Sequence, residues 1–119
     1  MNNYKEIYMR GVVGSGLCVA SDDGQKIYEE IEKAFKAGKK VKLSFDGVDD
    51  LTSAFLNSAI GQLYGKFSEQ EIKEKLSISE GTATQENLVL LKRVVDRAKE
   101  FFKDSRRFES VAREIIGEN

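Results

Sequence analysis

The stretch KLSFDGVDDLTSAFLNSAIGQLYG, residues 42–65, decides the fold of this protein. It begins inside a segment, residues 39–45, whose apolar and polar side chains alternate, and this alternation predicts a strand. The polar sequence DGVDD then turns the chain. A strongly apolar helix follows, and Thr52 and Ser53 stand at its start. A strand that leads through a short loop into a helix is typical of an α/β fold.

Working outward, strands and helices alternate along the rest of the chain. The sequence predicts strands over residues 3–13, 17–20, 39–45 and 76–79. It predicts helices over residues 21–38, 52–67, 69–76, 85–103 and 105–119. A turn at residues 14–16 would send the second strand back along the first. We expect one α/β domain over residues 1–119, a small mixed β-sheet of about four strands packed by four to five helices.

Polar residues at the expected helix starts predict the N-caps. Ser21 or Asp22 would cap the first helix, and Ser68 with Glu71 has the spacing of a capping box. Thr82 or Thr84 would cap the longest helix. In the strand over 39–45, the alternation turns Val41, Leu43 and Phe45 toward the core, and Lys40, Lys42 and Ser44 toward solvent.

The composition excludes several classes of function. The net charge of −1 lacks the basic excess of a non-specific nucleic-acid binder. The chain has no histidine and one cysteine, Cys18, so neither a zinc site nor a disulfide framework is expected. Cys18 lies in an apolar run and is expected to be a buried thiol. With no apolar run long enough to span a membrane and no signal-peptide pattern, we expect a cytoplasmic protein without a cofactor.

Two further motifs have simple structural interpretations. The sequence GVVGSG, residues 11–16, lacks the GK[ST] ending of a nucleotide-binding loop and is interpreted as a turn. Asp46, Asp49 and Asp50 follow a strand, where carboxylates can bind Mg²⁺ or accept phosphate. A turn with a helix-capping aspartate is the favoured interpretation, and a Mg²⁺-dependent phosphoacceptor or enzyme is the alternative.

The Thr52-Ser53 pair allows two interpretations. Thr52 or Asp50 can satisfy the free amides at the helix start, as an N-cap does. Alternatively, the pair is where a phosphoryl group is attached, because this group is tolerated at a helix start and would add negative charge to an acidic rim. Such a charge could switch a surface that docks to a partner.

A second alternative concerns the long helix. Its basic residues, together with those that follow it, could form a patch that binds nucleic acid, although a solvated helix face explains them as well. These residues are Lys92, Arg93, Arg97, Arg106 and Arg107.

The order of strand, Gly-Val, acidic linker and Ser at a helix start resembles the STAS domain of bacterial anti-sigma-factor antagonists. There, a strand of the type LDLSGV precedes DSSG, whose first Ser is phosphorylated. On this pattern Ser53 takes the place of the phosphorylated Ser, and Thr52 takes that of the Asp. Ala54 and Phe55 replace the Ser-Gly.

The chain is still more similar to a STAS-like domain family of unknown function, with the pattern DF.GV..I..SF....G.L. The positions that fit are Phe45, Gly47, Val48, Leu51, Ser53, Phe55, Gly61 and Leu63. In the ASDDG sequence of residues 20–24, Asp22 stands where the family's S-R-x-x-G motif has Arg, and Ser44 replaces a strand Asp.

The resemblance implies a regulatory module that binds a protein partner, such as an ATPase-type serine kinase or a related sensor protein, and is not an enzyme. No catalytic residue is therefore expected. Ser53, and second to it Thr52, is the candidate for phosphorylation. The docking candidates are Asp46, Gly47, Asp49, Asp50 and Asn57. The apolar face of the last predicted helix would either complete the core or form a homodimer.

Overall fold

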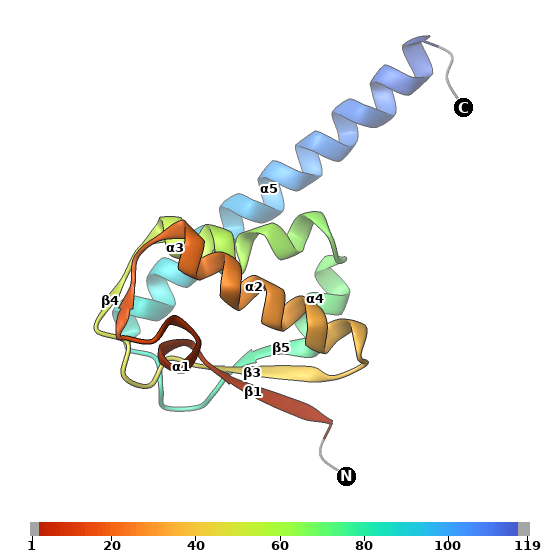
Figure 1. The fold of residues 1–119 in the computed structure, drawn as a ribbon. Helices are drawn as coiled ribbons and strands as arrows, with labels where there is room; N and C mark the ends of the chain where they lie inside the picture. Colours follow the sequence, from red (N-terminus) through yellow and green to blue (C-terminus); the bar gives the residue numbers. More distant parts are fainter. Residues whose placement is uncertain (1–2, 117–119) are drawn as a thin grey trace.

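The computed structural model describes residues 3–116, and the side chains through residue 103 (Figure 1). The strands are β1 (Tyr4–Tyr8), β2 (Leu17–Cys18), β3 (Lys40–Ser44), β4 (Asp50–Leu51) and β5 (Leu76–Ile78). The α-helices are α1 (Met9–Val13), α2 (Ser21–Lys36), α3 (Ser53–Ala59), α4 (Glu69–Lys75) and α5 (Gln85–Ile116). A 3₁₀ helix, η1 (Gly61–Gly65), follows α3.

The central sheet is parallel and has the strand order β1-β3-β5. Helical segments separate its strands along the sequence, and such crossover connections allow parallel pairing. β2 and β4 form a separate two-stranded parallel pair. The α/β class is confirmed. Every strand pairing in the described part of the chain is parallel, however, where the sequence predicted a mixed sheet.

The N-terminal segment differs from its prediction. The strand ends at Tyr8, and residues 9–13 form α1 because Met9 turns into the core and is fully buried. Gly14 then ends α1 in the left-handed conformation, with φ 92°. β2 does not return along β1, since Leu17 and Cys18 pair with Asp50 and Leu51 of β4. The expected hairpin is therefore wrong, and β2 connects the N-terminal segment to the start of α3.

The predicted alternation along β3 is confirmed at most positions. Val41, Leu43 and Phe45 are buried, whereas Lys40 and Lys42 are exposed. Ser44, predicted to face solvent, is buried. Its hydroxyl oxygen accepts a hydrogen bond from the Asp46 amide at 3.2 Å, because the turn after β3 folds back over it.

Helix α2 covers one face of the sheet and packs along α3 (Figure 1). The two helices approach closely at Gly24, where a Cβ atom would lie 2.4 Å from the Phe55 carbonyl oxygen. The predicted side-chain cap of α2 is absent: Ala20 occupies the N-cap position. Ser21 is the first helical residue, and its carbonyl accepts a hydrogen bond from the Ser58 hydroxyl at 2.8 Å. The start of α2 is thus tied to α3.

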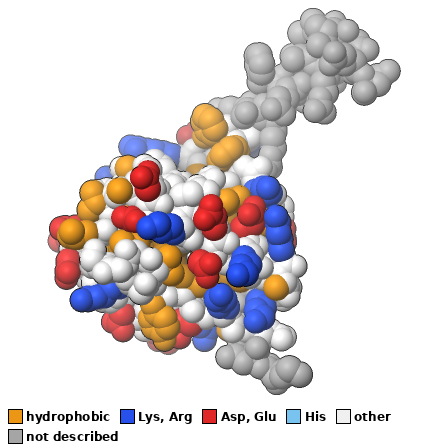
Figure 2. Space-filling model, viewed as in Figure 1, with side chains coloured by type: hydrophobic (Ala, Val, Ile, Leu, Met, Phe, Trp, Pro, Cys, Tyr) orange, Lys and Arg blue, Asp and Glu red, His pale blue; other side chains and the backbone are white. Residues whose placement is uncertain are grey.

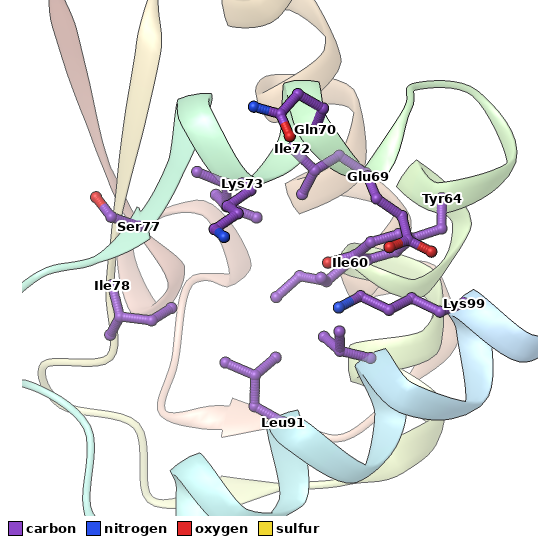
Figure 3. A pocket seen from close by; sticks show the side chains of 12 residues that line it. Ile60, Tyr64, Glu69, Gln70, Ile72, Lys73, Ser77, Ile78, Leu91 and Lys99 are labelled. Carbon is purple, nitrogen blue, oxygen red and sulfur yellow. The ribbon is translucent and has the colours of Figure 1, made fainter.

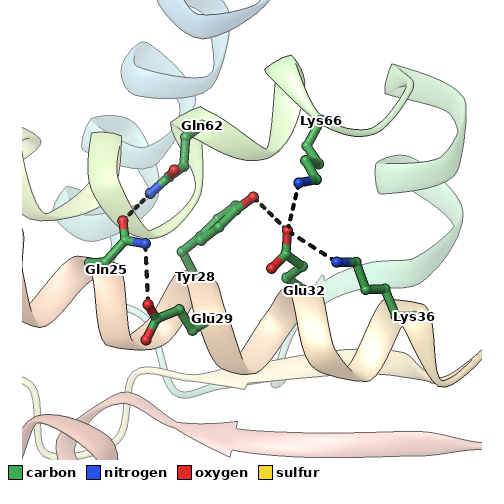
Figure 4. A network of polar contacts seen from close by, with 7 residues as sticks. All are labelled: Gln25, Tyr28, Glu29, Glu32, Lys36, Gln62 and Lys66. Carbon is green, nitrogen blue, oxygen red and sulfur yellow. Dashed lines mark hydrogen bonds and ion pairs between the residues drawn. The ribbon is translucent and has the colours of Figure 1, made fainter.

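A polar network joins α2 to η1 and the residue that follows η1 (Figure 4). The Tyr28 hydroxyl donates to the Glu32 carboxylate at 2.9 Å, and Lys66 pairs with the same carboxylate at 3.4 Å. The Gln62 amide donates to the Gln25 side chain at 2.7 Å. The hydrogen bond from Tyr28 is the main cause that lowers the pKa of Glu32.

The predicted helix over 52–67 is divided at Ile60 into α3 and η1. Gly61 and Gly65 lie in the second part, and glycine is a weak helix former. The following cap is as predicted: the Ser68 hydroxyl oxygen accepts from the Glu71 amide at 3.1 Å and starts α4.

Helix α5 is capped by Thr84, whose hydroxyl oxygen accepts from the Asn87 amide at 3.1 Å. The helix is continuous to Ile116, so the separate last helix predicted over 105–119 is wrong in its boundary. Its apolar residues after 103 lie outside the described side chains, and the expected core or homodimer contact stays a prediction.

None of the helices in the described part of the chain has the length and apolar character of a membrane span.

Candidate functional site

Thr52 is the N-cap of α3, as predicted. Its hydroxyl oxygen accepts a hydrogen bond from the Phe55 amide at 3.1 Å, and the hydroxyl donates to the Val19 carbonyl at 2.6 Å. The Thr52 amide also donates to the Cys18 carbonyl at 3.2 Å. One half-buried side chain therefore caps α3 and ties it to the segment that leads into α2. A phosphoryl group on Thr52 would replace the hydroxyl hydrogen and so remove the hydrogen bond to Val19.

Ser53 is the first residue of α3, and it is exposed. Among the residues whose side chains are described, none makes a hydrogen bond with the Ser53 hydroxyl. Of the pair, Ser53 is thus the accessible hydroxyl. Helix α3 has seven residues, so its dipole adds little to the binding of an anion here. Exposure is the property that makes Ser53 the candidate for modification.

Asn57 lies one helical turn after Ser53 and is also exposed. Residues four apart on a helix share a face, so Ser53 and Asn57 present side chains on the same side of α3. The opposite side carries Phe55, Leu56 and Ala59 into the core. The structure thus brings two of the predicted residues together.

The loop over residues 46–50 is held by backbone contacts. The amides of Asp49 and Asp50 both donate to the Gly16 carbonyl, at 2.9 and 3.2 Å. Gly47 has a φ of 74°, in the left-handed region that favours glycine. Its carbonyl accepts from the Arg10 guanidinium at 3.5 Å. This loop is therefore a positioned surface that leads directly into β4 and α3.

The three aspartates of this loop are exposed, and they point to different neighbours. The Asp49 carboxylate lies against Gly16, where a Cβ atom would overlap with it. Asp46 instead lies near Tyr8, where Glu6 and, less strongly, Asp46 raise the pKa of the phenol. Within the described part of the chain, no group of three or more acidic, cysteine or histidine side chains could hold a metal ion. The geometry therefore gives the Mg²⁺ alternative no support.

The sequence did not predict several side chains that other strands bring to the region around the 46–50 loop. The Ser79 hydroxyl donates to the Glu6 carboxylate at 2.6 Å. The Thr82 hydroxyl oxygen accepts from the Phe45 amide at 3.1 Å. Ser79 and Phe45 directly follow β5 and β3, and the carboxyl ends of parallel strands are the usual place for ligands in such sheets. Glu6 lies in the middle of β1. The end of β1 at Tyr8 was not predicted, because the predicted strand ran on to Val13.

The remaining predicted residues lie elsewhere. Cys18 is fully buried, and burial raises the pKa of its thiol to about 11, so it is a core thiol as predicted. Lys92, Arg93 and Arg97 are exposed on α5, and Lys92 pairs with Asp96 at 2.8 Å. Arg106 and Arg107 lie outside the described side chains. Over the face in view, acidic and basic side chains are interspersed (Figure 2).

Parallel strands connected by helices, with an exposed hydroxyl and an acidic loop near the strand ends, define a small α/β domain with a polar edge. Residues 23–86, more than half of the chain, match the STAS-like domain family of unknown function. The protein belongs to this family. No curated protein and no solved structure matches the chain. The match includes β3, the 46–50 loop and α3, and so contains the predicted site.

Proposed function

We propose that this protein is a regulatory module that binds a protein partner and is not an enzyme. The docking surface consists of the predicted candidates Asp46, Gly47, Asp49, Asp50 and Asn57, with Ser53 among them. Phosphorylation of Ser53 switches this surface. The STAS-like family and the absence of histidine from the sequence support a binding role.

The observation that carries the proposal is that two adjacent hydroxyls differ in their contacts and exposure. The Thr52 hydroxyl is engaged in two hydrogen bonds, whereas Ser53 is exposed beside it. A kinase can therefore reach Ser53 without opening the cap of α3. Kinase access and fold stability are separated onto neighbouring residues, as a reversible switch requires.

Charge gives the direction of the switch. A phosphoserine adds a charge of about −1.5 to −2 at neutral pH. Here it joins a surface that already carries Asp46, Asp49 and Asp50, with Arg10 contacting the same loop. A partner that packs closely on this surface would have to desolvate the added charge. Phosphorylation is thus expected to release the partner, which would be an ATPase-type serine kinase or a related sensor protein.

The first experiment is affinity capture of the tagged protein from its native host, with phosphosite mapping on the same sample. We expect a kinase-type or sensor partner and phosphate on Ser53. The affinity of this partner is then measured for Ser53→Asp and for Ser53→Asn. Asparagine is the matched control because it has the size of aspartate without its charge.

Weaker partner binding for Ser53→Asp than for Ser53→Asn supports the switch. Tighter binding for Ser53→Asp contradicts its direction. A stable partner whose affinity is the same for both variants, with Ser53 never phosphorylated, leaves a docking module without a switch. Partner binding that is insensitive to Asp49→Asn and Asp50→Asn contradicts the docking surface itself.

A further inference from the structure

A cavity of about 530 Å³ lies between η1, α4, β5 and α5 (Figure 3). Its volume is in the range of small-molecule sites, which run from about 300 to 1,000 Å³. All four of these elements contribute side chains to its wall. It involves none of the docking-surface residues, so it is a second, separate feature of the molecule.

Most of the cavity wall is apolar. Ile60 and Ile72 are buried beneath it, and Leu91 and Val95 of α5 pack against the same core. Leu76 and Ile78 extend the apolar wall along β5. A ligand in this cavity would therefore bury an apolar body, at a gain of about 25 cal/mol per Å² of surface removed from water.

Two lysines place positive charge at this apolar wall. The ammonium groups of Lys73 and Lys99 point into the cavity from α4 and α5 (Figure 3). Neither forms an ion pair with the side chains described, whereas Lys66, Lys75 and several other lysines do. Lys99 lies 5.9 Å from the centre of the Tyr64 ring. Two unpaired like charges that face one hollow are a favourable setting for an anion.

The charge count of the wall selects the kind of anion. Glu69, which lies beside Tyr64, is the one acidic residue among those that line this cavity (Figure 3). Asp96 is not among the lining residues, although the hydrogen bond from Lys92 and, less strongly, the charge of Lys99 lower its pKa. Burial, followed by the charge of Glu69, raises the pKa of the Tyr64 phenol. The wall thus carries one positive charge in excess. A monoanion such as a carboxylate neutralises it, whereas a phosphate monoester would bring close to two negative charges.

The shape of the cavity points to an elongated ligand. A second depression of about 390 Å³ shares Tyr64, Glu69 and Lys99 with the first and adds Phe102 and Lys103. The two hollows therefore adjoin. Together they form an extended groove. Phe102 and Lys103 line only the second hollow, so they extend the groove beyond Lys99 and leave the charge count of the first cavity unchanged.

We propose that this groove binds a medium-chain fatty carboxylate. The carboxylate lies between Lys73 and Lys99, and the alkyl chain lies on the apolar wall formed by Ile60, Ile72 and Leu91. The inference goes beyond the proposed docking function, because it concerns a different surface and a small-molecule ligand.

The test is titration of the full chain with decanoate, below its micelle-forming concentration, by calorimetry and by methyl NMR. We expect saturable binding with shifts of the Ile60, Ile72 and Ile78 methyl signals. The double variant Lys73→Gln/Lys99→Gln should weaken binding by about tenfold or more, because charge-assisted hydrogen bonds to the carboxylate are lost. Lys33→Gln, an exposed lysine of α2, is the matched control and should leave the affinity unchanged.

A second comparison needs no variant. Decanol has the same chain without the charge, and it should bind the unaltered protein at least about tenfold more weakly than decanoate. Equal affinity for the two compounds would refute the role of the lysines. Absence of saturable binding at millimolar decanoate, or shifts confined to exposed Leu88 and Val89, would overturn the proposal. None of these results depends on whether Ser53 is phosphorylated.

Discussion

Gly24 sets how closely α2 approaches α3, and its replacement by alanine tests the packing directly. A Cβ atom at this position would lie 2.4 Å from the Phe55 carbonyl oxygen and 2.9 Å from Cβ of Ser58. Neither atom sits at the end of a flexible side chain. To accept the methyl group, α2 must therefore move away from α3, which loosens the contacts that position Thr52 and Ser53.

The expected magnitude comes from two opposing effects. In a free helix interior, Gly→Ala stabilises by about 0.5–1 kcal/mol, because alanine loses less backbone entropy on folding. Overpacking a tight contact costs about 1–3 kcal/mol. With two contacts under 3 Å, one of them to a backbone oxygen, we expect the steric cost to dominate. The net loss should be about 1–2 kcal/mol, or a fall of about 4–8 °C in Tm for a chain of this size.

The assay is urea and thermal unfolding followed by far-ultraviolet circular dichroism. Gly11→Ala in α1 is the matched control, since the nearest atom to its Cβ would be Cβ of Tyr8 at an ordinary 3.5 Å. The control should be neutral or slightly stabilising. If Gly24→Ala is also stabilising, the reasoning about the helix crossing is refuted.

Four further predictions concern three side chains, Thr52, Cys18 and Glu32. Thr52→Val keeps the shape but loses the cap and the hydrogen bond to Val19, so the free energy of unfolding in urea should fall by about 1–2 kcal/mol; an unchanged value would contradict the cap. The Cys18 thiol, with its pKa raised to about 11, should react with Ellman's reagent only on unfolding, and fast native labelling would contradict its burial. This raised pKa also favours folding below the pKa of the unfolded thiol, so Cys18→Ala should lessen the loss of stability as pH rises from about 8.5 toward 11. The lowered pKa of Glu32 contributes stability above the pKa of the unfolded carboxyl, about 4.3. Glu32→Gln should therefore lose less stability than the unaltered protein in an acid titration, and an equally steep loss would contradict the role of Lys66 and Tyr28.

The helix caps and the strand alternation could be predicted because each depends on interactions within a few residues of the chain. Ser68, Thr52 and Thr84 cap helices through amides three residues away, so the chemistry and the spacing are both visible in the sequence. The alternation along β3 likewise reports burial on one face of a strand. The position of the Thr52-Ser53 pair at a helix start was predictable to the same extent, whereas its role as a site stays a prediction.

Contacts between distant segments were not predictable. The Arg10 guanidinium reaches the Gly47 carbonyl across 37 positions, and Ser79 reaches Glu6 across 73. The turn residues at 14–16 predicted a hairpin between the first two strands, whereas β2 pairs in parallel with β4. A turn does not specify which strand will pair with the segment that follows it. The alternation of β3 predicts an exposed Ser44, but the turn after β3 covers this side chain.

By itself, the sequence determined the α/β class, the starts of α3, α4 and α5, and the family pattern around Ser53, since these depend on hydrophobic period and capping within a few residues. Only the tertiary structure decided which hydroxyl is exposed, how the aspartates are separated, and that Lys73 and Lys99 face one cavity. These properties depend on where elements pack against one another. Packing brings together side chains that no local pattern relates.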